Sequence, residues 1–114
     1  MSEEEPVVEY DGKTAVVRVP PLRSKSDTTE LLTDLGALQH ALPDCFSWTI
    51  DLTRVMHVPL SLLGSLRSYQ NVFEAKGGGI SLVLRNRDAV APSLFNSLQT
   101  IFKIESAKHL LDRE

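Results

Sequence analysis

Strict alternation of apolar and polar residues over positions 46–52 constrains the fold of this chain more than any other feature. In the segment FSWTIDL, aromatic and aliphatic residues occupy every second position, and serine, threonine and aspartate stand between them. Side chains of a β-strand point alternately to its two faces, so this pattern predicts a strand with one face in the core. The apolar positions are Phe46, Trp48, Ile50 and Leu52.

Leucines at helical spacing stand on both sides of this strand. The first stripe follows Asp27 and Glu30, which together resemble a capping box, and it stops before Pro43. The second stripe begins at Leu60 and stops at the glycine run 77–79, because glycine readily adopts the left-handed conformation that ends a helix. Both segments are predicted to be amphipathic helices. Their apolar faces consist of Leu31, Leu35, Leu38 and Leu42, and of Leu62, Leu63, Leu66, Tyr69 and Phe73.

The first twenty residues predict a β-hairpin. β-Branched runs flank Asp11-Gly12, a pair that typically supplies the two positive-φ residues of a type I′ turn. The second strand of the hairpin is expected to end at Pro20-Pro21, because proline cannot donate to a strand ladder.

The last third of the chain continues the alternation of strands and helices. ISLVL, residues 80–84, is predicted to be a buried strand, and Pro92 is expected to open a third helix. FKI, residues 102–104, is predicted to be a last short strand, and Ser106 is expected to cap a terminal helix. The third helix would bury Leu94, Leu98 and Ile101, and the terminal helix Leu110 and Leu111.

The order β-β-α-β-α-β-α-β-α predicts an α/β fold. Strands that are joined through helices form right-handed crossovers and a largely parallel sheet, and the opening hairpin makes this sheet mixed. We therefore expect a single domain over residues 1–114, with about four helices. Residues 1–5 are expected to be flexible.

Composition and charge narrow the class of protein. The net charge of −3 and the pI near 5.6 do not favour a nucleic-acid-binding surface, which is usually strongly basic. A lone cysteine, Cys45, forms no internal disulfide and suits a reducing compartment. No apolar run has the length of a membrane span, and the acidic start MSEEEP resembles neither a signal nor a transit peptide. We expect a cytoplasmic protein without direct membrane insertion.

No set of residues predicts catalysis. The glycine run 77–79 leads from a helix to a strand, whereas a phosphate-binding loop leads from a strand to a helix. Cys45 enters a strand and His40 lies late in a helix, so a buried structural thiol is the favoured interpretation. The histidines at positions 40, 57 and 109 lack metal-ligand spacing. Arg85 and Arg87 follow a strand and are interpreted as a solvated rim. We expect no enzyme activity, metal or cofactor.

The order of elements, together with the segment FSWTIDLTRVMHVPLSLLGSLRSYQNVFEAKGGGISLVL, resembles the STAS domain, named for sulfate transporters and anti-sigma factor antagonists. In that family a strand ending in a Leu-Asp-Leu-Ser type sequence precedes a signature loop and the second helix. Residues 50–53, Ile-Asp-Leu-Thr, match the strand end, and Val55-Met56 match the apolar pair that follows it. The tail IFKIESAKHLL resembles the closing strand and helix of the family. The resemblance covers about residues 7–111.

The signature loop is where this chain departs from the family. Bacterial antagonists carry Asp-Ser-Ser or Asp-Ser-Thr followed by glycine, and a partner kinase phosphorylates the first serine. The resemblance aligns Val58 with the aspartate, Pro59 with the phosphorylated serine, Leu60 with the next hydroxyl residue and Ser61 with the glycine. Pro59 has no hydroxyl, and its fixed φ suits the first position of a helix. Ser61 is the one nearby hydroxyl that could replace the lost site.

The resemblance implies a non-catalytic protein–protein interaction module in the bacterial cytoplasm, similar to an anti-sigma factor antagonist. Its partner would be an anti-sigma factor kinase-like protein, and binding would lack the phosphorylation switch. The alternatives are an accessory subunit of a lipid-type ABC transporter, which would bind an ATPase subunit, and a scaffold component of a stressosome-like assembly. The oligomeric state stays open. The residues expected to bind the partner are Val58, Pro59, Leu60, Ser61 and Ser65.

Overall fold

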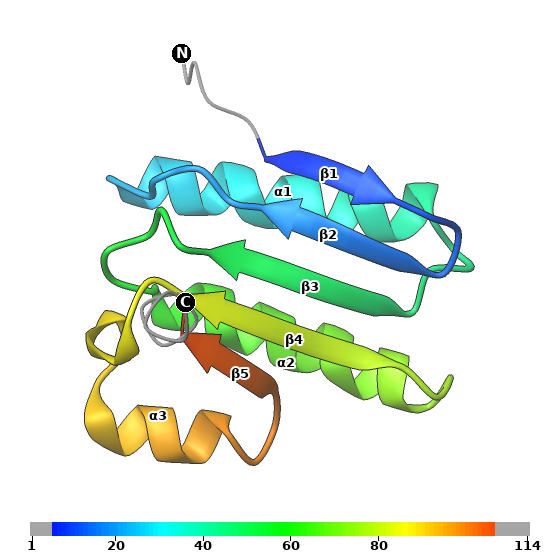
Figure 1. The fold of residues 1–114 in the computed structure, drawn as a ribbon. Coiled ribbons are helices and arrows are strands. Elements are labelled where there is room, and N and C mark those ends of the chain that lie inside the picture. Colours follow the sequence, from blue (N-terminus) through cyan, green and yellow to red (C-terminus); the bar gives the residue numbers. More distant parts are fainter. Residues whose placement is uncertain (1–5, 107–114) are drawn as a thin grey trace, which may run out of the picture.

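Five strands lie side by side in chain order in one mixed sheet, as the computed structural model of residues 6–106 shows (Figure 1). The first two strands are antiparallel, and each later pair is parallel. This arrangement confirms the predicted α/β fold with an N-terminal hairpin. The strands are β1 (Val7–Tyr10), β2 (Thr14–Arg18), β3 (Ser47–Leu52), β4 (Gly79–Leu84) and β5 (Lys103–Ser106).

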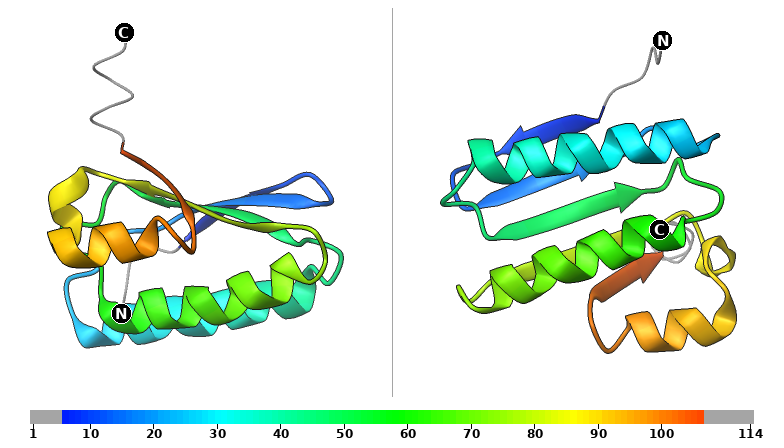
Figure 2. Two further views of the ribbon diagram at one scale, coloured as in Figure 1. Left: turned by 90° about the horizontal axis from the view of Figure 1, so that it is seen from below. Right: turned by 180° about the vertical axis from the view of Figure 1, so that it is seen from behind.

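The two longest helices cover the same face of the sheet (Figure 2). Right-handed crossovers that step in one direction across a sheet place their helices on one side of it. Among the described residues, the opposite face carries no helix. No described helix has the length and apolar character needed to cross a membrane. The helical elements are α1 (Lys25–Ala41), α2 (Leu60–Glu74), the single 3₁₀ turn η1 (Arg87–Ala89) and α3 (Pro92–Leu98).

Alternation along the three central strands produces the one-sided core. In β3 and β4 every second residue is buried, and the residues between them are only half-buried. The predicted strand around Trp48 is therefore confirmed, and it lies in the middle of the sheet. The Trp48 ring contacts Tyr69 and Phe73 of α2, with centroid distances of 5.0 and 4.9 Å. The buried sheet residues are Ala15, Val17, Trp48, Ile50, Leu52, Ile80, Leu82 and Leu84.

A buried polar side chain, that of Gln70, joins α2 to β4. The Gly79 N–H donates to the Phe46 carbonyl oxygen, so the next N–H, that of Ile80, points away from β3. Strand β5 begins opposite Ser81 and therefore offers this N–H no partner. The Gln70 Oε1 accepts it at 2.5 Å, which spares a buried donor a cost of about 1–3 kcal/mol.

The hairpin turn differs from the predicted type I′. Gly12 is the one residue of the turn with positive φ, at 102°, and it is followed by Lys13 as the second central residue. Asp11 donates its N–H to the Thr14 carbonyl oxygen at 3.1 Å, and its carboxylate accepts the Thr14 N–H at 3.0 Å. A glycine at the first central position is typical of type II′, which suits a right-twisted hairpin equally well.

Helix α1 begins about one turn earlier than predicted. Ser24 caps it: its hydroxyl accepts the Asp27 N–H at 3.2 Å. The carboxylate of Asp27 reaches back to the Arg23 N–H at 2.9 Å. Asp27 is thus the second member of the capping pair and not the first, and Glu30 lies exposed beyond it. The helix still ends before Pro43, as expected.

The glycine run ends α2 as predicted. Gly77 has a positive φ of 85°, and the Gly78 N–H donates to the Phe73 carbonyl oxygen at 2.8 Å. Helix α3 begins at Pro92 as expected but ends at Leu98, so Ile101 follows it in a turn. The predicted terminal helix around Leu110 and Leu111, and residues 1–5, lie outside the described residues.

Two glycine-to-alanine variants should have opposite effects on stability. A Cβ on Gly78 would lie 1.8 Å from the Phe46 carbonyl oxygen, so Gly78→Ala should lower the free energy of unfolding by about 1–3 kcal/mol. A Cβ on Gly64, in the middle of α2, meets nothing within 4 Å, so Gly64→Ala should raise it by about 0.5–1 kcal/mol. Urea unfolding monitored by Trp48 fluorescence measures both. A neutral Gly78→Ala would contradict this close backbone approach.

Candidate partner-binding surface

The carboxyl ends of the parallel strands and the first turns of the helices meet at one edge of the sheet (Figure 1). Residues 19–24 connect β2 to α1, residues 53–59 connect β3 to α2, and residues 85–91 connect β4 to α3. Open α/β sheets usually bind ligands outside the carboxyl ends of their strands. The segment singled out from the sequence, residues 58–61, lies at this edge.

Hydrogen bonds at the end of β3 hold the start of the β3–α2 loop. The carboxylate of Asp51 accepts the N–H of Thr53 at 2.9 Å and its hydroxyl at 2.7 Å. The Val55 N–H donates to the Leu52 carbonyl oxygen at 3.0 Å, and the Val55 side chain is fully buried. The Asp-Leu-Thr sequence at this strand end therefore forms a turn that directs the chain toward α2.

The second half of the loop is tied to its neighbour. The Val58 N–H donates to the Ala89 carbonyl oxygen of η1 at 2.9 Å, and the Val58 side chain is 8% exposed. Pro59 follows as the N-cap residue, with φ −65° and ψ 141°, and its carbonyl oxygen accepts the Leu63 N–H at 3.3 Å. Pro59 was expected to be the first helical residue. It lies one position earlier, because its ψ is extended, and α2 begins at Leu60.

The loop and the first residue of α2 each expose one large apolar side chain. Met56 is 60% exposed and Leu60 is 70% exposed, whereas Val55 and Val58 point into the core. Of the five residues predicted to bind a partner, Leu60 and Ser61 are exposed, and Pro59 and Ser65 are half-buried. The side chain of Val58 belongs to the core, so its contribution to any surface would come from its backbone.

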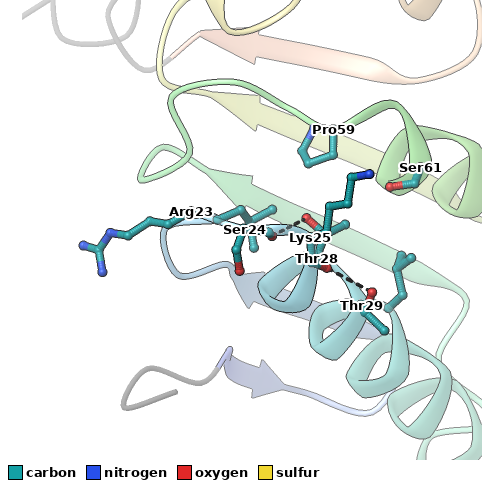
Figure 3. Close-up of a pocket in the computed structure, with 9 residues that line it drawn as sticks. Arg23, Ser24, Lys25, Thr28, Thr29, Pro59 and Ser61 are labelled. Atoms are coloured by element: carbon teal, nitrogen blue, oxygen red, sulfur yellow. Dashed lines mark hydrogen bonds between the residues drawn. The ribbon is translucent and has the colours of Figure 1, made fainter. Parts of the chain in front are cut away.

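A cleft of about 570 Å³ separates the first turns of α1 and α2 (Figure 3). Pro59 and Ser61 line it on the α2 side. The residues on the other side were not singled out from the sequence, because only the packing of α1 beside α2 brings them here. They are Leu22, Arg23, Ser24, Lys25, Thr28, Thr29 and Leu32.

Two basic residues, Arg23 and Lys25, line the cleft, and no acidic side chain is among its lining residues. The Lys25 side chain extends toward Pro59 and Ser61, whereas the guanidinium of Arg23 points away from them (Figure 3). The amino end of α2 adds partial positive charge, because its first N–H groups have no partner within the helix and no side chain caps it, whereas the Asp27 carboxylate lies in the first turn of α1. The cleft floor is apolar, with Leu22 and Leu32 beside Pro59. This combination favours a segment that carries both an apolar and an acidic side chain.

Residues considered for chemistry do not form a reactive site. Cys45 is buried, and its thiol donates weakly to the Ser47 carbonyl oxygen at 3.7 Å, as expected of a structural thiol. His40 is exposed on α1, His57 is exposed on the β3–α2 loop, and Arg85 is exposed after β4. Within residues 6–106, no group of three histidine, cysteine or acidic side chains is placed to bind a metal ion. His109 lies outside the described residues.

Comparison of the chain with models of known protein families found no match, and comparison with curated proteins found none either.

Two leucines near the start of α2, one exposed and one buried, test which side chains belong to the surface and which to the core. Leu60→Asp should change the free energy of unfolding by no more than about 0.5 kcal/mol, because this side chain contacts mostly solvent. Leu63→Asp, three residues along the same helix, should lower it by about 3 kcal/mol or more, because a charge would be buried there. Thermal and urea unfolding measure both. A large loss of stability for Leu60→Asp would show that Leu60 packs in the core.

Proposed function

We propose that this protein is a non-catalytic interaction module of the STAS type, similar to an anti-sigma factor antagonist. It would bind its protein partner through the β3–α2 loop and the first turn of α2. The observation that carries this proposal is the exposure of Met56 on the loop and of Leu60 at the start of α2, whereas the neighbouring Val55 and Val58 are buried. Single exposed apolar residues are common, but one on an anchored loop followed by another at the start of the next helix favours a binding surface.

Anchoring of the loop supports this role energetically. Ordering a flexible loop upon binding costs about 1–2 kcal/mol for each backbone residue that becomes fixed. Here the backbone is already held by the bonds from Val55 to Leu52 and from Val58 to Ala89. The entropy cost of ordering the loop would therefore arise during folding and not during binding. More of the contact energy from Met56 and Leu60 would then contribute to affinity.

The residues that line the cleft specify the partner further. Lys25 would attract an acidic side chain, and Pro59 and Leu32 would contact an apolar side chain beside it (Figure 3). An anti-sigma factor kinase-like protein is the partner that the STAS resemblance implies. In the two alternative functions, the same surface would bind an ATPase subunit of a lipid-type transporter or another component of a stressosome-like scaffold. Binding measurements with each candidate partner distinguish these three functions.

The loop lacks the family's regulatory switch in this proposal. Pro59 occupies the aligned position of the phosphorylated serine, and Val58 replaces the preceding aspartate. The Pro59 backbone starts α2 without any side-chain cap. Binding would therefore be constitutive, or controlled by the partner alone.

Binding to the purified candidate partners, kinase-like protein and ATPase subunit, tests the docking surface. Leu60→Asp should weaken the affinity measured by calorimetry at least about tenfold, because it places a charge at the centre of the contact. Val72→Asp is the matched control: Val72 is 42% exposed on the last turn of the same helix and should leave the affinity unchanged. Equal affinity for the wild type and Leu60→Asp would place the contact elsewhere.

Incubation with the kinase-like partner and ATP should leave the intact mass of the protein unchanged. Ser61 is exposed in the first turn of α2, where the helix dipole tolerates a phosphate. It is nevertheless expected to stay unmodified, because an uncharged, proline-stiffened segment replaces the usual kinase recognition sequence. Ser61→Ala serves as the control. Stoichiometric addition of one phosphate to the wild type, absent from Ser61→Ala, would restore the switch.

A further inference from the structure

The two edge strands of the sheet are protected to different degrees. Natural sheets guard a free edge with charged residues, which prevent another strand from pairing with it. On β5, Lys103 and Glu105 are exposed and provide this protection. On β1, Val7, Val8 and Tyr10 are between 40% and 56% exposed, and nothing among residues 6–106 pairs with the outer side of the strand. The β1 edge therefore offers an apolar surface for strand pairing.

The one charged residue of β1 is already neutralised within the chain. Glu9 forms an ion pair and hydrogen bond with Arg18 of β2. This hydrogen bond with Glu9 raises the pKa of Arg18, so the guanidinium of the pair is charged at any ordinary pH. An incoming strand would meet a paired carboxylate, which repels it less than a free one.

The free hydrogen-bonding groups of β1 follow from its register. Asp11 donates its N–H to β2, and in an antiparallel strand the direction of the backbone groups alternates. The N–H and C=O groups of Val8 and Tyr10 therefore point outward. Pro6, which precedes the strand, offers a carbonyl oxygen but no N–H.

These groups are complementary to those of a second β1 in antiparallel orientation. With Val8 opposite Val8 of the second copy, the two residues exchange two hydrogen bonds, and each Tyr10 N–H faces a Pro6 carbonyl oxygen. This register also places Val7 opposite Glu9, so like charges do not stand directly opposite each other. Shifting it by two residues would bring Glu9 opposite Glu9, which is unfavourable. The charge of Glu9 thus favours the register with Val8 opposite Val8 over the one with Glu9 opposite Glu9.

Side chains beneath the edge fit the same arrangement. A groove of about 360 Å³ runs between β1 and α1, and Val8 lines it. Leu35 and Leu38 form its apolar wall, and the small residues Ala37 and Ala41 leave room on the exposed side of α1. In the symmetric register, the second Val8 would approach this groove at the two-fold axis.

We propose that β1 pairs with β1 of a second copy of this chain, with Val8 at the two-fold axis, so that the two sheets become one. The pairing covers the exposed side chains of Val8 and Tyr10. It leaves the β3–α2 loop of each copy outside the contact, so the dimer would display two partner-binding surfaces. The proposal does not depend on which partner those surfaces bind.

Sedimentation velocity tests the pairing through one position on the strand. Wild-type protein at roughly 100 µM, above the range of micromolar dissociation constants, should sediment as a dimer. Val8→Lys places a charge at the axis and should sediment as a monomer. Val8→Pro should do the same, because it removes an outward N–H and leaves the β1–β2 bonds intact. Val72→Lys alters an equally exposed valine on α2 and should stay dimeric.

Thermal unfolding of the same variants checks that each is folded. If Val8→Pro does not fold, Val8→Lys alone tests whether β1 forms the dimer contact. A wild-type monomer at this concentration would overturn the proposal. A Val8→Lys variant that remains dimeric, or a Val72→Lys variant that becomes monomeric, would overturn it as well, because the dimer would then use another surface.

Discussion

Burial of one face of the sheet against α1 and α2 is the constraint on which the rest of the structure depends. Trp48 and its alternating neighbours on β3 provide that face, and Tyr69 and Phe73 of α2 pack on the Trp48 ring. Apolar burial at about 25 cal/mol per Å² makes this packing the largest stabilising contribution. It fixes the direction of α2 and therefore the place where the β3–α2 loop must leave the sheet. The positions of the exposed Met56 and Leu60 side chains therefore follow from the packing of the core.

The sequence predicted the features that repeat along the chain. Alternation around Trp48 and the leucine stripe from Leu62 to Phe73 both reflect burial of many side chains, so single exceptions do not obscure them. The sequence predicted helix starts and turn types less well, because a single hydrogen bond can determine where a helix begins or which turn forms. Ser24 and not Asp27 is the N-cap residue of α1, and Gly12 is the one residue of the hairpin turn with positive φ. The cleft was not predictable from either segment, because Lys25 and Ser61 meet only through helix packing.

Pro59 links the stability of the loop to its proposed use. A serine at this position would cap α2 through its side chain and could also be phosphorylated. Under the proposed STAS alignment, Pro59 would perform only the structural part, by presetting its own φ, and Val58, an apolar anchor in the core, would stand where the family has a carboxylate. Under that proposal, the loop would have a fixed shape in place of a regulated charge. In this account, the apolar residues Met56 and Leu60 are displayed permanently.

Amide hydrogen exchange at Val58 in the free protein tests this central claim most directly. If the loop is preformed, the Val58 N–H stays bonded to the Ala89 carbonyl oxygen and the side chain stays buried. Its exchange should then be slowed to the level of the central strands, and it should report global unfolding. Exchange at Val58 close to that of an unstructured peptide would show that the loop opens freely. The protein would then not present a fixed surface, and the account of the β3–α2 loop would be wrong.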